Sequence, residues 1–434
     1  TQFWKCFIVN SKQWLKNYSQ RILNDDTSNN ENVDWFIAYK IPKLESNATP
    51  FDTGFAFVYL LSTNHESSWI QSHKLIDDKQ SLFGQTLNQL YTNPKENYIL
   101  YSDQPPTEKS SMIYGHSKGV LAVDKNTGFW LIHSVPKFPP LIQSRKYDYP
   151  LSGRENGQTA LCISFNTSTE TEKIVNQLLY IRPKIYDFNL SDDIKYLVPN
   201  FNDLINGKWS KKLTNTQSIY TIDFNEFISF SKSKLAIIDI YTDLVASSLM
   251  SNLFVETWRK GSGIPLQSVC NQKYTVINVN KIMLQHLYWT FESDHSKWAI
   301  SDNTVETSKT FLCIGDMNRM KSQFKRGGGI VCFNNYFAWN AFKQSILERD
   351  SCPYNLKSES SNQTNIFDTI LNFIEDLLIS FFESRTDRRT GSRPMVADTG
   401  RLFEASTGCV IDGALTRIKE KPSAEVDSST ALRI

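Results

Sequence analysis

The tripeptide His-Ser-Lys occurs twice in this chain, and each copy has residue types that acid–base chemistry needs. One copy lies in "GHSKG" and the other in "DHSKW", and each is followed by a short apolar run. The chain has six histidines, and two of them stand in these copies. Because alternate residues of a strand point to the same face, the spacing predicts that His116 and Lys118 share one face of a strand, as do His295 and Lys297.

Two such strands facing one pocket would supply the groups that cleave a phosphodiester. One imidazole attacks phosphorus and forms a phosphohistidine, while the other protonates the leaving oxygen and then activates water. Lys118 and Lys297 would hold the phosphate oxygens. Such a site needs no metal, and no convincing carboxylate cluster for magnesium surrounds the two copies. One ring must be neutral and the other charged, which favours mildly acidic solution; the residues do not say which ring is the nucleophile.

A structural interpretation of each histidine stays open beside the catalytic one. A single His-Ser-Lys in 434 residues is close to chance, and a lone histidine is more often a core or surface residue. The duplication favours function, because a second predicted strand follows each copy and carries His133 or Asn318. For His133 alone, a hydrogen-bonded core residue is the better interpretation. Three histidines have no such context and are predicted to be structural or exposed: His65, His73 and His286.

Short apolar segments bounded by turns predict the strands that must position these groups. A buried strand is expected in "VDWFIAYKIP" (33–42), and two strands around the turn "DKNTG" within residues 111–140. The second copy lies in a predicted strand over 295–301, followed by another over 310–319. Residues 324–332, "FKRGGGIVC", are predicted to form a Gly-rich loop, and no Lys-Ser/Thr follows to make a P-loop.

Helical spacing occurs in two places. Residues 234–263 predict a helix with a Gly-rich end, and residues 365–382 carry one apolar stripe typical of an amphipathic helix. After about Ser384 the sequence is polar and aperiodic, which predicts disorder. Cys409 lies in this tail, and the remaining six of seven cysteines suit three disulfides.

Composition narrows the class of protein. Hydrophobic residues make up 40% of the chain, ample for a sizeable core, and a net charge of +2 neither supports nor excludes a nucleic-acid partner. No CxxC pair is present, so a zinc ribbon or thioredoxin-type motif is not expected. Scattered cysteines and N-x-S/T sequons favour an oxidising, secretory route. The sequons are at Asn17, Asn47, Asn166, Asn189 and Asn362.

The first residues of the chain and the length of its apolar stretches indicate where the protein is located. The chain starts at Thr1 without a basic-then-apolar leader, so we expect that a signal peptide has been removed or that the sequence is incomplete. No apolar stretch reaches the roughly 18–20 residues of a membrane span, so we expect no membrane association. We expect a secreted or lysosomal protein.

Several longer stretches, in order from about residue 33 to Cys352, match one known family. They are "VDWFIAYKIP", "YSDQPP", "SSMIYGHSKGVLAVDKNTGFWLIHSVPKFPP", "GQTALCISF", "DLVASSLMSNLFVETWRKG", "YTVINVNKI", "DHSKWAIS" and "CIGDMNRMKSQFKRGGGIVC". With them the chain resembles the deoxyribonuclease II family. The resemblance implies an α/β fold, α+β with mixed sheets and flanking helices, built as a pseudo-dimer of two phospholipase D-like halves in one chain.

The same resemblance implies the organisation of the chain. A first half at residues 33–215 would carry one His-Ser-Lys copy and a second half at 216–355 the other. Residues 1–32 would be a divergent N-terminal segment. The amphipathic helical extension at 356–384 and the disordered tail at 385–434 have no family counterpart.

The resemblance also implies an activity. The family consists of acid endonucleases that cut DNA with little sequence preference, need no metal or other cofactor, and leave 3′-phosphate ends. The family's catalytic residues fall on His116, Lys118, His295 and Lys297. His133 falls on a histidine needed for activity or integrity, and Asn318 on a polar phosphate-binding position. The implied disulfides are Cys313–Cys332, Cys270–Cys352 and Cys6–Cys162, where Cys6 is the available N-terminal partner.

Two other functions remain open on this fold. The divergent N-terminus and tail are compatible with a catalytically inactive protein that binds DNA or another surface. A phospholipase or another phosphodiesterase is the third possibility, because the second copy reads H-x-K-x4-D through Asp302. The first copy has Val123 at the matching position, and the deoxyribonuclease-like flanks favour DNA as the substrate. Cleavage of DNA at acidic pH with a chelator present would separate the three.

Overall fold

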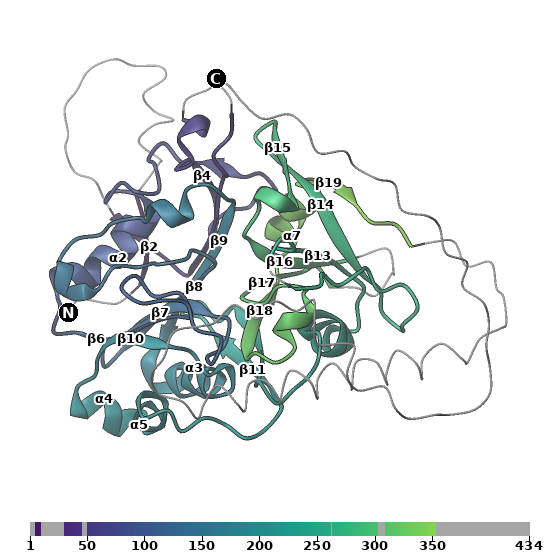
Figure 1. Ribbon diagram of the computed structural model, residues 1–434. Coiled ribbons are helices and arrows are strands. Elements are labelled where there is room, and N and C mark those ends of the chain that lie inside the picture. Colours follow the sequence, from purple (N-terminus) through teal and green to yellow (C-terminus); the bar gives the residue numbers. More distant parts are fainter. Residues whose placement is uncertain (1–4, 10–29, 46–49, 262, 303–308, 353–434) are drawn as a thin grey trace, which may run out of the picture. The chain divides into compact units, whose positions relative to one another are not determined.

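The computed structural model describes residues 5–9, 30–45, 50–261, 263–302 and 309–352. They form a mixed α/β structure with two large sheets and few helices (Figure 1). All of them belong to the first of two compact units of the chain. Several predictions fall outside the described residues: the helix at 365–382, the tail with Cys409, and the sequons at Asn17, Asn47 and Asn362.

The first sheet has eight strands in the order β10-β6-β7-β8-β9-β3-β4-β5, and all neighbours are antiparallel. Its strands are β3 (Trp35–Lys40), β4 (Phe57–Leu61), β5 (Ile70–Gln71), β6 (Asn97–Ser102), β7 (Lys118–Val123), β8 (Thr127–His133), β9 (Gln158–Asn166) and β10 (Ile185–Asn189). A separate two-stranded sheet pairs β1 (Cys6–Val9) with β2 (Asn30–Val33).

The second sheet has nine strands in the order β11-β12-β18-β17-β16-β13-β14-β15, with β19 beside β14. Its neighbours are antiparallel except for the parallel pair β13 and β14. Its strands are β11 (Thr214–Tyr220), β12 (Glu226–Lys232), β13 (Leu253–Thr257), β14 (Val276–Leu284), β15 (Leu287–Thr290), β16 (Lys297–Ser301), β17 (Phe311–Gly315), β18 (Gly328–Asn334) and β19 (Ile346–Arg349).

Helices cover the sheets, and apolar side chains gather in three clusters. The helices are α2 (Leu82–Thr92), α3 (Thr167–Ile181), α4 (Asp192–Leu197), α5 (Asn200–Ile205), the π-helix η4 (Ile240–Ala246), α6 (Ser247–Leu249) and α7 (Tyr336–Gln344), with short 3-10 turns η1 (Phe51–Thr53), η2 (Ile142–Ser144), η3 (Leu151–Gly153), η5 (Phe291–Ser293) and η6 (Lys321–Gln323). One cluster joins α2 to the first sheet, and another joins η4 to the second. The third contains residues of both sheets together with α3 and α7. No described helix has the length and apolar character to cross a membrane.

The predicted hairpin in residues 111–140 is confirmed, because β7 pairs with β8 across a short turn. The Asp124 carboxylate closes that turn by accepting hydrogen bonds from the backbone N–H groups of Asn126 and Thr127, at 2.6 and 2.8 Å. The buried strand predicted in 33–42 is also confirmed as β3. In contrast to the prediction, neither His116 nor His295 lies in a strand, since β7 and β16 begin two residues later, at the lysines.

Three other element predictions were wrong in part. Residues 324–332 are not simply a loop, because β18 starts inside the run of glycines at Gly328. Asn318 lies beyond the end of β17 rather than in it. Residues 234–263 form one short helical stretch and then strand β13. This strand was missed because Phe254 faces one apolar cluster and Val255 another, so a strand buried on both faces gives no alternation to recognise.

Three disulfides join distant parts of the chain. They are Cys6–Cys162, Cys270–Cys352 and Cys313–Cys332, the same pairs that the resemblance implies. The first ties β1 to β9 of the first sheet, and the third joins neighbouring strands β17 and β18. The prediction of a disulfide-bonded protein is confirmed.

Candidate active site

The two His-Ser-Lys copies occupy matching places in the two sheets. In the first sheet the lysine begins β7, within the antiparallel series β6-β7-β8-β9-β3. In the second sheet the lysine begins β16, within the antiparallel series β13-β16-β17-β18-β12. Each histidine therefore stands just before a central strand, where a loop from the other sheet can reach it.

His116 is held by two backbone carbonyls that belong to the second sheet. Its backbone N–H donates to the carbonyl of Gly327, directly before β18, at 2.8 Å. Its ring Nδ1 lies 2.6 Å from the carbonyl of Asp316, directly after β17. The His116 side chain is 7% exposed. The histidine of one sheet thus takes its orientation from the other.

His295 is held in the reciprocal way by the first sheet. Its backbone N–H donates to the carbonyl of Gly157, directly before β9, at 2.8 Å. Its ring Nδ1 lies 3.0 Å from the carbonyl of Ser134, directly after β8, and 3.2 Å from Oε1 of Gln158. Ser134 and Gln158 are themselves joined, since the Ser134 hydroxyl donates to Gln158 Oε1 at 2.6 Å.

These contacts determine the tautomer of both rings. A backbone carbonyl can only accept a hydrogen bond, so Nδ1 of His116 and of His295 must carry the proton. In the neutral ring the lone pair then resides on Nε2, the atom that can attack an electrophile or accept a proton. Both histidines therefore have the same tautomer, with the proton on Nδ1 and the lone pair on Nε2.

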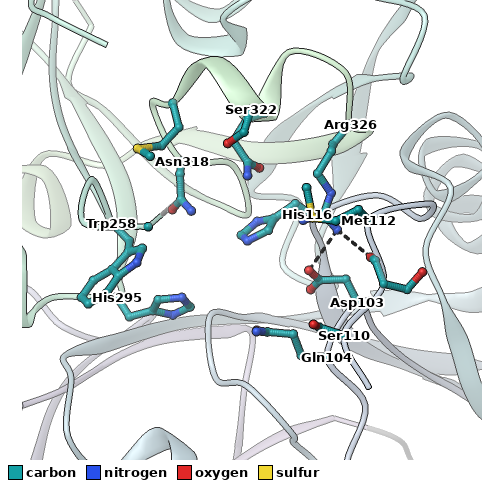
Figure 2. Close-up of a pocket in the computed structure, with 14 residues that line it drawn as sticks. Asp103, Gln104, Ser110, Met112, His116, Trp258, His295, Asn318, Ser322 and Arg326 are labelled. Carbon is teal, nitrogen blue, oxygen red and sulfur yellow. Dashed lines mark hydrogen bonds and ion pairs between the residues drawn. The ribbon is translucent and has the colours of Figure 1, made fainter. Parts of the chain in front are cut away.

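The two rings line one cleft with a volume of about 200 Å³ (Figure 2). Other lining residues come from both sheets, among them Asp103 beyond β6 and Trp258 beyond β13. Asn318 also lines the cleft, and its buried Oδ1 has no hydrogen-bond partner within the described residues. Of the predicted site residues, the structure therefore brings His116, His295 and Asn318 together around one space.

The two lysines lie outside the residues that line this cleft. The Lys118 side chain is 2% exposed, and its Nζ forms an ion pair with Oδ1 of Asp103 at 2.6 Å. Arg326 binds the other carboxylate oxygen of Asp103 at 3.0 Å. The Arg326 guanidinium also donates to the carbonyls of Ser111 and Tyr114, which precede the first histidine. Asp103 thus balances two cations, one from each sheet.

Lys297 has different surroundings. Its side chain is 1% exposed, and Nζ donates to the backbone carbonyl of His295. Among the described residues no carboxylate forms an ion pair with it within 4 Å, whereas Lys118 has Asp103. Burial, and then the charge of Lys118, hold the pKa of Lys297 well below its usual value. Lys118 therefore has an ion-paired carboxylate. Lys297 is acted on, without a direct ion pair in the described part of the chain, by the charges of Asp294, Asp316 and Asp103.

Burial also sets the protonation of the two histidines. Burial lowers the pKa of His116 well below its usual value, and the charge of Asp103 opposes this effect. Burial lowers the pKa of His295 as well, followed by the positive charges of Lys297 and Lys118. In the unliganded site both rings are therefore neutral at pH 7.

His133 does not line the cleft. Its side chain is 1% exposed and packs edge-on against Phe138, with ring centroids 5.2 Å apart. Burial lowers its pKa to about 3, and the Lys118 charge adds to this shift. Neither ring nitrogen makes a hydrogen bond of good geometry with a described residue. His133 is a core residue, and its link to the cleft is its neighbour Ser134.

The other candidate residues lie away from this cleft. His65, His73 and His286 are exposed, in keeping with the prediction for them. Of the two described sequons, Asn166 is partly exposed, while Nδ2 of Asn189 donates to the carbonyls of Lys95 and Glu96 at 2.9 Å. The described residues contain no group of three His, Cys, Asp or Glu side chains arranged to hold a metal ion.

Four important residues were not singled out from the sequence. Asp103, Gln158, Trp258 and Arg326 all lie inside stretches that carry the family resemblance. None of them has a spacing or a motif that assigns a role, because each reaches the site from the end of a different strand. Only the register of the strands brings them to the two histidines.

Comparisons with known proteins identify the family of this chain. Residues 26–352 match the family model described as deoxyribonuclease II. The chain is 37% identical to human deoxyribonuclease-2-beta over 330 residues, covering 74% of this chain and 89% of the relative. It is 37% identical to plancitoxin-1 of Acanthaster planci over 336 residues (74% and 90%) and 34% identical to deoxyribonuclease-2-alpha of Sus scrofa over 333 residues (74% and 88%). The chain belongs to the deoxyribonuclease II family, whose members are DNA-hydrolysing endonucleases.

Proposed function

We propose that this protein is an acid endodeoxyribonuclease that hydrolyses DNA phosphodiesters without a divalent metal and leaves 3′-phosphate ends. The observation that carries the proposal is the pair of histidines in one cleft. Each comes from a different sheet, and each has Nδ1 held by a carbonyl so that Nε2 is the reactive nitrogen. The family membership supports DNA as the substrate.

We further propose that the two sheets are the two phospholipase D-like halves of a pseudo-dimer. The matching strand series and the reciprocal contacts of the two histidines support this assignment. The proposed halves are residues 33–215 and 216–355. In this arrangement neither half contains a complete site, because each one fixes the histidine of the other.

The first chemical step uses the two rings in different protonation states. Nε2 of one neutral imidazole attacks phosphorus and forms an N–P bond. The bond to the 5′-oxygen breaks, and the other imidazolium gives its Nε2 proton to that oxygen, which leaves as a 5′-hydroxyl. The strand that keeps the phosphorus is then attached to the enzyme as a phosphohistidine.

In the second step water hydrolyses the phosphohistidine. The second imidazole, now neutral, takes a proton from water, whose oxygen attacks phosphorus as the N–P bond breaks. The product carries a 3′-phosphate, and both rings return to their starting state. Lys118 and Lys297 supply positive charge beneath the two histidines, and Asn318 contributes a polar group at the cleft wall.

Acidic conditions follow from the lowered pKa values of the two histidines. Both rings are neutral at pH 7, so the general acid is missing there. As the pH falls below the usual histidine pKa of about 6.5, the population with one charged ring rises, and so does the rate. The bound phosphodiester is a monoanion, and its charge would favour the charged ring further.

The substrate and setting are proposed from the same features. Contacts to phosphate and groove shape, rather than base edges, would dominate binding of a relatively nonspecific nuclease. Three disulfides favour an oxidising compartment, so we propose a secreted or lysosomal location.

Plasmid nicking at acidic pH in the presence of a chelator tests the proposed function. The wild-type chain should nick, while His116→Ala and His295→Ala should each lose about 10³-fold or more of the rate. The double variant should be no worse than either single variant, since the rings act as a unit. His65→Ala, at an exposed histidine away from the cleft, is the matched control and should retain full activity.

The other outcomes identify the competing functions. Salt-dependent DNA binding without nicking would indicate a DNA-binding protein that has lost catalysis. Hydrolysis of a lipid headgroup without cleavage of DNA would indicate a phospholipase. Nicking that survives both alanine substitutions would overturn the two-histidine mechanism.

A further inference from the structure

We propose that Trp258 is a nucleotide-binding residue that stacks on the base next to the scissile phosphate, on the His295 side of the cleft. This proposal rests on the proposed nuclease function and adds a base-binding subsite to it. Trp258 lines the cleft and its indole lies edge-on to His295, with ring centroids 5.5 Å apart (Figure 2). An indole at this distance from the reactive ring is within reach of a base whose phosphate contacts that ring.

Trp258 is not needed by the apolar core. The other described tryptophans belong to the apolar clusters or pack against them: Trp35, Trp69, Trp130, Trp209, Trp289, Trp298 and Trp339. Trp258 belongs to none of the three clusters and is partly exposed. A large aromatic ring left at the wall of a polar cleft has apolar surface that a base can cover.

The strand register places Trp258 beside the second histidine. Thr257, the last residue of β13, pairs with Lys297. The equivalent pair in the first sheet is Ser102 with Lys118, so the residue that corresponds to Trp258 is Asp103. One sheet thus presents a carboxylate at this position and the other an indole. Because Asp103 is 3% exposed and is bound by Lys118 and Arg326, it offers no surface to a base, and the partly exposed indole is the side on which a base can lie.

The residue after Trp258 is anchored by its side chain. The next residue, Arg259, donates to the carbonyl of Val279 at 2.6 Å and to the side chain of Asn280 at 2.9 Å. Its guanidinium also lies over the ring of Phe291, 4.1 Å from the centroid. A stacking platform fixed between a strand and an anchored arginine loses little conformational entropy when a base binds.

A double-mutant cycle between protein and substrate tests this subsite. The substrate is a duplex oligonucleotide with one cleavable phosphodiester in the scored strand, with or without an abasic nucleotide on its 5′ or 3′ side. Trp258→Ala should lower kcat/KM on the intact oligonucleotide about 5- to 100-fold, the range of one base–aromatic stack. With the abasic nucleotide at one of the two positions, wild type and Trp258→Ala should cleave at similar rates.

The controls separate stacking from a structural effect. Trp258→Phe should recover part of the lost rate on the intact substrate and none on the abasic one. Tyr196→Ala removes an aromatic ring that is 89% exposed on α4, outside the residues lining the cleft, and should change nothing. If the Trp258→Ala loss is the same on intact and abasic substrates at both positions, the residue acts on His295 instead and the proposal is overturned.

Binding measurements keep this test separate from the nuclease proposal. Anisotropy titrations of the same oligonucleotides should show the same loss of affinity for Trp258→Ala and for the abasic substrate, without further loss on combining them. A wild-type chain that binds with this pattern but does not cleave would contradict the proposed catalysis and leave the subsite standing. Cleavage that needs both histidines, without coupling between Trp258 and a base at either tested position, would support the proposed catalysis and overturn the subsite.

Discussion

At the scale of single residues, the lysines of the two His-Ser-Lys copies differ in their ion pairing. Asp103 neutralises Lys118 and also binds Arg326 of the other sheet, while Lys297 has no such carboxylate among the described residues. The carboxylate also acts on His116, because its charge raises the pKa of that ring against the effect of burial. Asp103 is therefore a positioning residue whose charge also affects the pKa of His116.

Replacing Asp103 with Asn should shift the pH dependence of cleavage towards lower pH. Without the carboxylate the pKa of His116 falls further, so the limb of the kcat/KM profile that this ring controls moves to lower pH. The direction is the same whether the ring must be neutral or charged. Profiles of kcat/KM for wild type and Asp103→Asn measure the shift.

A matched control exists for this substitution. Asp203 forms an exposed ion pair with Lys208, so Asp203→Asn should leave the pH profile unchanged. An unshifted profile for Asp103→Asn with a uniformly lower rate would assign this residue to folding alone.

At the scale of elements, the end of α3 explains two glycines near His116, Gly327 directly before β18 and Gly115. A Cβ added to Gly327 would lie 2.1 Å from the carbonyl oxygen of Ile181, the last residue of α3, and one added to Gly115 would lie 2.0 Å from it. Both glycines are next to His116: Gly115 precedes it in the chain, and the carbonyl of Gly327 accepts a hydrogen bond from its backbone N–H. The glycines permit the close approach of two sheets and a helix, and they do not form a phosphate-binding loop.

Gly327→Ala should therefore destabilise the protein and also reduce cleavage. We expect a loss of about 1–3 kcal/mol in the free energy of unfolding, the usual cost of an overpacked buried site. A smaller effect is expected for Gly261→Ala, because a Cβ there would meet its nearest neighbour, the indole of Trp258, at 3.5 Å. Denaturant unfolding and nicking rates measure both effects, and equal stability of the two variants would contradict the steric argument.

At the scale of the whole molecule, buried histidines link the fold to pH. Burial lowers the pKa of His116, His133 and His295 in the folded protein. Below the usual pKa of about 6.5 the unfolded chain therefore binds more protons than the folded one, and stability falls as the pH falls. The proposed mechanism needs acidic solution, so it requires that the folded protein tolerate this loss. Its three disulfides oppose it by restricting the unfolded chain.

His133→Asn should reduce this dependence on pH. The folded pKa of His133 is about 3, so between pH 6.5 and 3 this residue costs about 1.4 kcal/mol of stability for each pH unit. The variant should be less stable than wild type at pH 7, because packing against Phe138 is lost, yet its stability should fall less between pH 7 and 4.5. Denaturant unfolding at the two pH values checks this. An equal fall in both proteins would show that the pKa of His133 does not differ between the folded and unfolded chain.

The sequence by itself determined the two His-Ser-Lys copies, the family and the local hairpin of β7 and β8. These depend on neighbours in the chain, such as the Asp124 turn that closes β7 onto β8. It did not determine β13, because a strand buried on both faces has no alternating pattern. The assignment of the two lysines to phosphate binding remains a proposal, since in the folded protein both are almost completely buried and lie outside the residues that line the cleft.

Tertiary structure alone decided what surrounds the two histidines. The carbonyls that set their tautomers lie on the opposite sheet, about 160 and 200 residues away in the chain. Asp103 and Trp258 come to the cleft because the strands they follow pair with the strands that begin at the lysines. Such contacts depend on strand order and register, which arise from packing of the whole sheet rather than from any local signal. The two His-Ser-Lys copies can be found by reading the chain, and their union in one site is a product of the fold.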